Sequence, residues 1–166
     1  MGTPMSRRNV RTALALLCAL VVPAGAAAAA EAVLARTDEI VRWISEHSNY
    51  PAQLARVPVF VFLPPETIRH GFARTSMGYS SQTSRVRAAQ TQGTIYLPDT
   101  FKLGRDDYIL LHELVHHMQD ESGRNFGCLA EREREAYVLQ TRFVEETGIG
   151  ETPNDMFMLM LRCDIR

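Results

Sequence analysis

The sequence predicts a small α+β domain in which a short sheet packs against several helices. Residues 57–63 and 94–97 are rich in β-branched and aromatic side chains, which is typical of strands. The segments around them carry apolar residues at helical spacing. The chain has 166 residues, and this length favours a single domain.

The first 30 residues have the layout of a secretory signal peptide. Three arginines open the chain, and residues 12–22 form an apolar stretch that is too short to span a bilayer comfortably. Small residues follow, and we expect cleavage near residues 28–30. Residues 1–30 are therefore predicted to be a leader, and residues 31–166 a domain that is periplasmic or secreted. An uncleaved membrane anchor is the alternative.

Removal of this leader would leave a mildly acidic chain. The full sequence has 18 basic and 19 acidic residues, and the leader holds three of the arginines and no acid. The remainder has 15 basic and 19 acidic residues, a net charge of −4. This charge gives no reason to expect nucleic acid or anionic lipid as a partner. We also expect no stable membrane insertion after cleavage.

The first half of the predicted domain contains one long helix and one strand. Residues 31–47 are expected to be helical, because apolar residues such as Val33 and Ile40 recur at helical spacing between charged ones. Residues 57–63 are expected to form the first strand. Pro58 favours either an edge position for this strand or a place at its start, since proline cannot donate a hydrogen bond to a central ladder.

The middle of the chain combines short elements with a long polar segment. Residues 66–70 favour a short helix. Residues 74–92 are polar without a period, which predicts a long loop or a weak hairpin. Long loops in compact domains are often functional, so this segment is a candidate for substrate binding or for a lid. Residues 94–97 form the second expected strand, which Pro98 closes.

Three helices are expected after the second strand. The first opens at Asp106, because acids suit the positive start of a helix, and runs to about Glu121. The second spans residues 129–147. The third is expected to have Thr152 as its cap and Pro153 as its first residue. Its three methionines are interpreted as packing residues.

The first of these helices contains His112-Glu113-Leu114-Val115-His116, which has the spacing H-E-x-x-H. Residues four apart share one face of a helix, so His112 and His116 can bind the same metal ion. Glu113 stands beside them as a general base for an attacking water. The motif predicts a catalytic Zn²⁺ site, which takes three protein ligands and leaves one position open.

The third ligand is expected from the next helix, where Glu131, Glu133 and Glu135 are candidates. Glu133 lies three and four residues before Ala136 and Tyr137, on the apolar face of that helix. The other two acids fall on a more solvated face. Glu133 is therefore the predicted ligand, and Glu135 is the second choice.

The two cysteines after the leader are Cys128 and Cys163. In an oxidising compartment, two cysteines favour a disulfide, which here would link the segment after the metal-binding helix to the last helix. Metal ligation by these cysteines is the weaker alternative, because neither belongs to a C-x-x-C pair.

At these residues the chain resembles the zincins, the zinc metallopeptidases with an H-E-x-x-H helix. The metzincin subgroup would need Gly at position 119 and His at position 122, where Gln119 and Ser122 stand. The segment from Glu133 to Tyr137 is similar to the E-x-E-A-D stretch of gluzincins, in which the first Glu binds zinc. Tyr137 replaces the Asp that orients a zinc-bound histidine in those enzymes.

This resemblance covers residues 94–147 and implies a minimal zincin-like core from a small exported bacterial family. A small antiparallel or mixed sheet would pack on the H-E-x-x-H helix and on the Glu-bearing helix. Residues 93–97 would then pair with an extended substrate through their backbone. The oxyanion donor stays open among five candidates: His70, Tyr79, Tyr96, His117 and Tyr137.

The function that this resemblance implies is an exported zinc-dependent metallohydrolase. A peptidase is the leading hypothesis, with Glu113 as its general base and a peptide or protein of the envelope or the exterior as its substrate. The alternative is a zincin-like envelope protein or binding module that holds zinc without catalysis. A metal-free scaffold is the third hypothesis.

Overall fold

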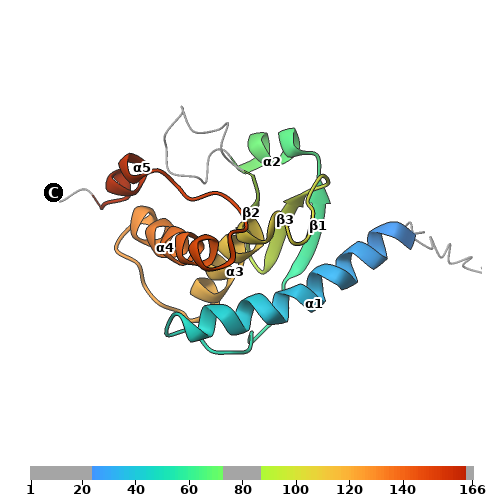
Figure 1. Cartoon of the computed structure of the whole chain (residues 1–166), viewed down its shortest axis with the longest axis horizontal. Helices are drawn as coiled ribbons and strands as arrows, with labels where there is room; N and C mark the ends of the chain where they lie inside the picture. The colour runs from blue at the N-terminus through green and yellow to red at the C-terminus, as the bar shows by residue number, and fades with distance from the viewer. Residues whose placement is uncertain (1–23, 73–86, 164–166) are drawn as a thin grey trace, which may run out of the picture.

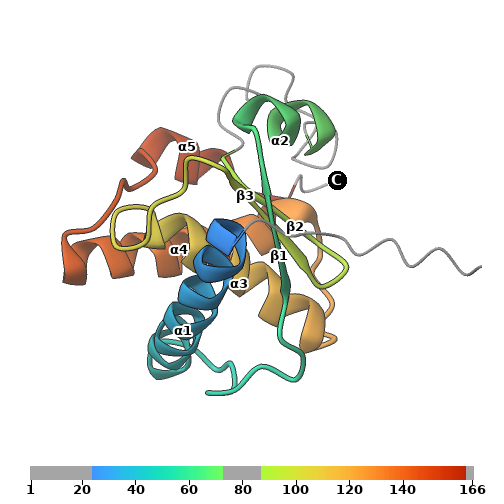
Figure 2. The ribbon, with the colours of Figure 1, turned by 90° about the vertical axis from the view of Figure 1, so that its right-hand side faces the viewer.

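Helix α3 (Asp107–Glu121) lies at the centre of the fold, with the sheet on one side and helices α1 and α4 against its other faces (Figures 1 and 2). The computed structural model describes residues 24–72 and 87–163, with side chains from residue 31 onward. Within these residues it shows the expected α+β class, with five helices and a mixed sheet of three strands. Every residue of α3 from Asp107 to Gln119 is buried.

The sheet contains β1 (Val59–Leu63), β2 (Ala89–Thr91) and β3 (Thr94–Pro98) in the order β1-β3-β2. Strand β1 runs parallel to β3, and β2 pairs with β3 in antiparallel orientation. A two-residue turn at Gln92 and Gly93, both with positive φ (49° and 81°), joins β2 to β3. The predicted edge position of β1 is confirmed, and residues 89–91 form a hairpin strand within the predicted polar segment. Residues 73–86 of that segment lie outside the described residues.

The remaining helices are α1 (Ala24–Glu46), α2 (Pro65–Phe72), α4 (Leu129–Thr147) and α5 (Asp155–Met160). Helices α2, α3 and α4 lie where the sequence predicts them. Helix α1 starts inside the predicted leader, but its described core residues begin only at Val33. Cleavage near residues 28–30 would therefore leave that part of the core in place. None of the helices in the described part of the chain has the length and apolarity to cross a membrane.

Helix α1 is attached to the centre of the fold by polar contacts as well as by apolar packing. Arg36 Nε donates to Oδ2 of the fully buried Asp107 over 2.8 Å, which satisfies a carboxylate at the start of α3. The indole of Trp43 packs edge-on against Phe143 and donates to Glu146 over 3.0 Å. Trp43 is thus a packing residue that also makes one polar contact.

The predicted start of α5 is wrong. The helix begins at Asp155, and Asn154 is its cap, with its side chain accepting a 2.8 Å hydrogen bond from Phe157 N. Thr152 and Pro153 belong to the preceding loop. The helix begins after a residue whose side chain can accept this hydrogen bond. Asparagine can act as such a cap as well as threonine.

The interpretation of the α5 methionines as packing residues is wrong for two of the three. Met156 and Met160 are 68% and 48% exposed. A helix of six residues can bury only one narrow face, and Phe157 and Leu161, four positions apart, occupy it. The exposed methionines lie on the other faces.

The predicted disulfide is present between Cys128 and Cys163. Cys128 directly precedes α4, and Cys163 follows α5, so the bond fastens the end of the described chain to the start of the Glu-bearing helix. This attachment matters because α5 is short and buries few residues of its own.

Replacing both cysteines by serine should lower the free energy of unfolding by about 3–4 kcal/mol, because the bond closes a loop with a sequence separation of 35. Chemical denaturation of the purified protein, with and without a reducing agent, measures this change. The unsubstituted protein should lose stability in the reducing agent and the double variant should not. Equal stability of the two proteins under oxidising conditions would contradict the bond.

In the loop after α4, glycine is required more strictly at position 150 than at position 148. A Cβ atom at Gly150, where φ is +112°, would lie 2.3 Å from a ring carbon of Tyr108, whereas a Cβ at Gly148, with φ +70°, would contact nothing within 4 Å. Gly148→Ala should cost about 1–2 kcal/mol through its backbone alone. Gly150→Ala should cost about 1–3 kcal/mol more through overpacking. Thermal unfolding of the two variants measures the difference. Equal losses of stability would show that the Tyr108 ring can move aside without cost.

Candidate metal site

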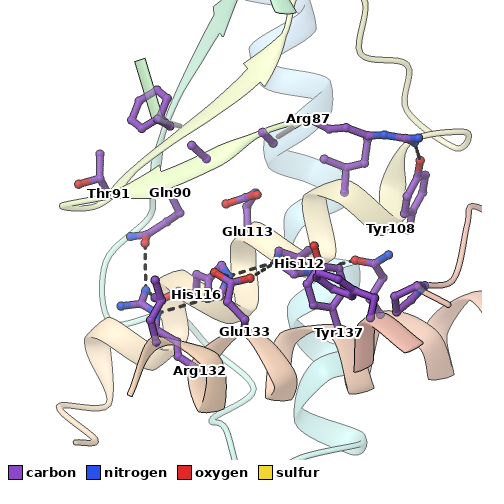
Figure 3. Close-up of a pocket in the computed structure, with 18 of the residues that line it drawn as sticks. Arg87, Gln90, Thr91, Tyr108, His112, Glu113, His116, Arg132, Glu133 and Tyr137 are labelled. Carbon is purple, nitrogen blue, oxygen red and sulfur yellow. Dashed lines mark hydrogen bonds and ion pairs between the residues drawn. The ribbon is translucent and has the colours of Figure 1, made fainter. Parts of the chain in front are cut away.

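Three side chains from two helices bring their ligand atoms to one point (Figure 3). The Nε2 atoms of His112 and His116 lie 3.1 Å apart. Oε2 of Glu133 lies 3.3 Å from Nε2 of His112, and Oε1 of Glu133 lies 3.4 Å from Nε2 of His116. The histidines share a face of α3, and the packing of α4 against α3 presents Glu133 to them. The structure thus brings together the three residues that the sequence predicts as ligands.

This arrangement fits one small divalent cation. A tetrahedral ion with ligand distances of about 2.0–2.1 Å separates its ligand atoms by roughly 3.3–3.4 Å. The separation of the two Nε2 atoms, 3.1 Å, is close to that value, and each of them lies 3.3–3.4 Å from one oxygen of Glu133. Two imidazoles and one carboxylate are also a ligand set of catalytic zinc sites, which keep a fourth position open.

Two buried glutamines contact the outer nitrogens of the histidines. Gln140 Oε1 lies 3.0 Å from Nδ1 of His112, and Gln119 Oε1 lies 2.8 Å from Nδ1 of His116. Neither glutamine is among the site residues predicted from the sequence. A signal was available for Gln140, because it follows Glu133 by seven residues, two turns along the same face of α4.

The carboxylate of Glu133 is held in its charged form. Burial alone would raise its pKa, but hydrogen bonds with His112 and His116 lower the pKa to well below its usual range. A charged carboxylate at this position is the form that binds a cation.

The carboxyl of Glu113 has the opposite electrostatic environment. Burial raises its pKa to about 7, and the negative charge of Glu133 adds to this effect. In Figure 3 the side chain points into the cleft on the sheet side of the three ligand residues. A carboxyl with a pKa near neutrality can both accept and return a proton at neutral pH.

Glu135 and Glu131 lie outside the group of three. Glu135 accepts hydrogen bonds from Tyr50 and Gln119 over 2.7 Å and 2.9 Å, and pairs with Arg124. Glu131 accepts a 2.8 Å hydrogen bond from the backbone of Gly127. Glu135, the second choice for a ligand, therefore supports a glutamine that contacts a histidine.

The ligand residues line a cleft of about 880 Å³. Strand β2 borders this cleft on one side, and α3 and α4 border it on the other (Figure 3). The assignment of residues 93–97 to substrate pairing is wrong, because both edges of β3 are already paired, with β1 and with β2. The strand that borders the cleft is β2, at the edge of the sheet.

Charged side chains at both ends of the cleft are paired with acids. Arg87 contacts the hydroxyl of Tyr108 and pairs with Glu151 over 2.8 Å. Arg132 lies at the opposite end (Figure 3). It pairs with Asp120 over 2.7 Å. The ends of the cleft are therefore polar, and each of these two arginines is neutralised by an acid.

Of the candidate oxyanion donors, Tyr137 is the one that lines the cleft within the described part of the chain. Its ring packs against the ring of His112, with centroids 4.3 Å apart. His117 is buried, its Nε2 contacts the carbonyl of Arg56 over 2.8 Å, and it does not line the cleft. Tyr79 lies outside the described residues.

Comparison with known protein families matches residues 27–166 to DUF6647, a domain of unknown function. No curated protein and no solved structure matches the chain. The matched span covers the whole domain predicted after the leader, including the two helices that carry His112, His116 and Glu133.

The raised pKa of Glu113 makes the stability of the metal-free protein depend on pH. Between about pH 4.5 and pH 7 the unfolded chain releases this proton while the folded chain keeps it, so stability falls as the pH rises through 7. The loss is of the order of 3 kcal/mol. Glu113→Gln should remove this loss, whereas Glu145→Gln, at an exposed acid of α4, should keep it.

Urea denaturation of the three proteins at pH 5 and pH 8 in the presence of EDTA measures the effect. The quantity to compare is the difference in unfolding free energy between the two pH values. A Glu113→Gln variant that loses as much stability as the unsubstituted protein would show that Glu113 ionises normally.

Proposed function

The chain belongs to the DUF6647 family, and we propose that it is an exported zinc-dependent hydrolase, most readily a peptidase. The single observation that carries the proposal is the convergence of His112, His116 and Glu133 in a cleft that also contains Glu113. A purely structural metal site would not need an open cleft beside it or an acid with a pKa of about 7.

The core of the molecule supports this proposal as a minimal zincin-like arrangement. A mixed sheet lies beside the helix with the H-E-x-x-H motif, and the following helix supplies the third candidate ligand. Strand β2 would bind an extended substrate through its outer edge, because it is the edge strand that borders the cleft. This places a peptide between the sheet and Glu113.

The residues of the site would have separate roles in the reaction. His112, His116 and Glu133 would hold the ion, which when bound polarises the scissile carbonyl and activates water. Glu113 would take the proton of the attacking water on its carboxylate and pass it to the leaving amine. The walls of the cleft, including Tyr137, would limit the access of bulk water.

Export rests on the layout of residues 1–30, and the disulfide agrees with it, because such bonds persist in oxidising compartments. The substrate would then be a peptide or protein of the envelope or the exterior.

The proposal is tested first by zinc content. The dialysed protein should contain about one zinc per chain, and His116→Ala and Glu133→Ala should lose it. Glu145→Ala is the matched control, because Glu145 lies on the same helix as Glu133, and this variant should keep the ion. Glu135→Ala should also keep it. Loss of zinc in Glu135→Ala but not in Glu133→Ala would identify Glu135 as the third ligand instead.

Catalysis is tested on a library of quenched fluorescent peptides. Glu113→Gln should retain zinc and lose about 10²-fold or more of the rate, because general base catalysis contributes on this scale. A variant as active as the unsubstituted enzyme would exclude Glu113 as the base. Stoichiometric zinc without cleavage of any peptide would favour the non-catalytic zinc-binding protein.

A further inference from the structure

We propose that Gln140 and Gln119 are positioning residues that hold the two histidines in the ring orientation and protonation state needed to bind the metal. This inference rests on the proposed metal site. It fills the gap left by Tyr137, which stands where gluzincins have an orienting Asp.

The amide of Gln140 is fixed at both of its ends. Its Nε2 donates to the carbonyl of Glu151 over 2.9 Å, and its Oε1 lies 3.0 Å from Nδ1 of His112. A carbonyl can only accept, so the amino group must face Glu151 and the oxygen must face the imidazole. Nδ1 of His112 therefore carries a proton, and Nε2 is the atom that would supply a lone pair when a metal ion replaces its hydrogen bond with Glu133.

Gln119 repeats this arrangement at the second histidine. Its Nε2 donates to the carbonyl of Arg132 over 3.0 Å and to Glu135 over 2.9 Å. With two acceptors on its amino side, its oxygen must face His116, and it lies 2.8 Å from Nδ1.

One contact competes with this assignment at His116. Arg132 Nε lies 3.3 Å from the same Nδ1 and is always a donor, so it would favour an unprotonated Nδ1. The Gln119 contact is the shorter one, and the Nη atoms of the guanidinium bind the His116 carbonyl at 3.0 Å and Asp120 at 2.7 Å. On the shorter contact, the proton lies on Nδ1 and is directed at Gln119.

The choice of an amide in place of a carboxylate has a chemical consequence. An amide oxygen accepts a hydrogen bond without carrying a charge, so the two glutamine contacts add no negative charge to the site. The negative charge at the ligand cluster then comes from Glu133, with the ionisable Glu113 beside it. Both glutamines are buried, which keeps water from competing for the Nδ1 protons.

The test compares Gln140→Met and Gln119→Met, which keep side-chain length and remove the acceptor. Gln53→Met, at an exposed position, is the matched control. Each buried variant should weaken zinc binding by 10- to 100-fold in competition with a chelator. In ¹H–¹⁵N NMR spectra of the zinc-loaded protein, Gln140→Met should lose the slowly exchanging Nδ1–H signal of His112 alone, and Gln119→Met that of His116 alone.

The paired NMR pattern separates positioning from a general loss of structure, which would affect both histidines alike. Zinc affinities unchanged from the Gln53→Met control, or loss of both signals in each variant, would overturn the inference. If the unsubstituted protein bound no zinc, the inference and the metal site would fall together. If it bound zinc tightly and cleaved nothing, the proposed catalysis would fail and the role of the glutamines would stand.

Discussion

The burial of α3 is the constraint on which the rest of the structure depends. Thirteen consecutive residues of this helix are buried, and several of them are polar or charged. Buried polar groups need partners, and α3 finds them in different elements of the fold. Arg36 of α1 pairs with Asp107, and Gln140 of α4 contacts His112. A carbonyl before β1 contacts His117. The positions of the surrounding elements thus depend on their hydrogen bonds and ion pairs with polar residues of α3, as well as on packing against its apolar side chains.

The same burial gives two neighbouring carboxyls opposite properties. Glu133 faces two imidazoles, and hydrogen bonds with them outweigh the effect of burial on its pKa. Glu113 has no such partner, and burial dominates. The fold thereby separates a permanently charged acid from one that can exchange a proton near neutral pH, a division of roles that sites for hydrolysis use. Burial of Glu113 costs stability, and the apolar residues of the core around α3 offset that cost.

Much of the fold could be predicted where the local signal was strong. The bounds of α4 follow from its helical period, and the assignment of Glu133 follows from helical phase. Strand β2 could not be predicted in the same way. Its three residues carry no apolar run, and they become a strand because the turn at Gln92 and Gly93 folds them onto β3. The contact of Gln140 with His112 likewise depends on the packing of α3 against α4, whereas Gln119 contacts His116 from three residues further along the same helix.

The anchoring of Gln140 to a backbone carbonyl has a consequence for variation within the family. The carbonyl of Glu151 holds the amide, and a residue of any type supplies a carbonyl. Substitutions at position 151 that leave the backbone path unchanged therefore preserve the orientation of His112. An insertion or deletion between α4 and α5 would displace the carbonyl and release the imidazole. The loop at residues 148–154 is thus constrained in its length and path, and in residue type at Gly150 and at the helix cap Asn154, whereas the contact with Gln140 places no demand on the side chain at position 151.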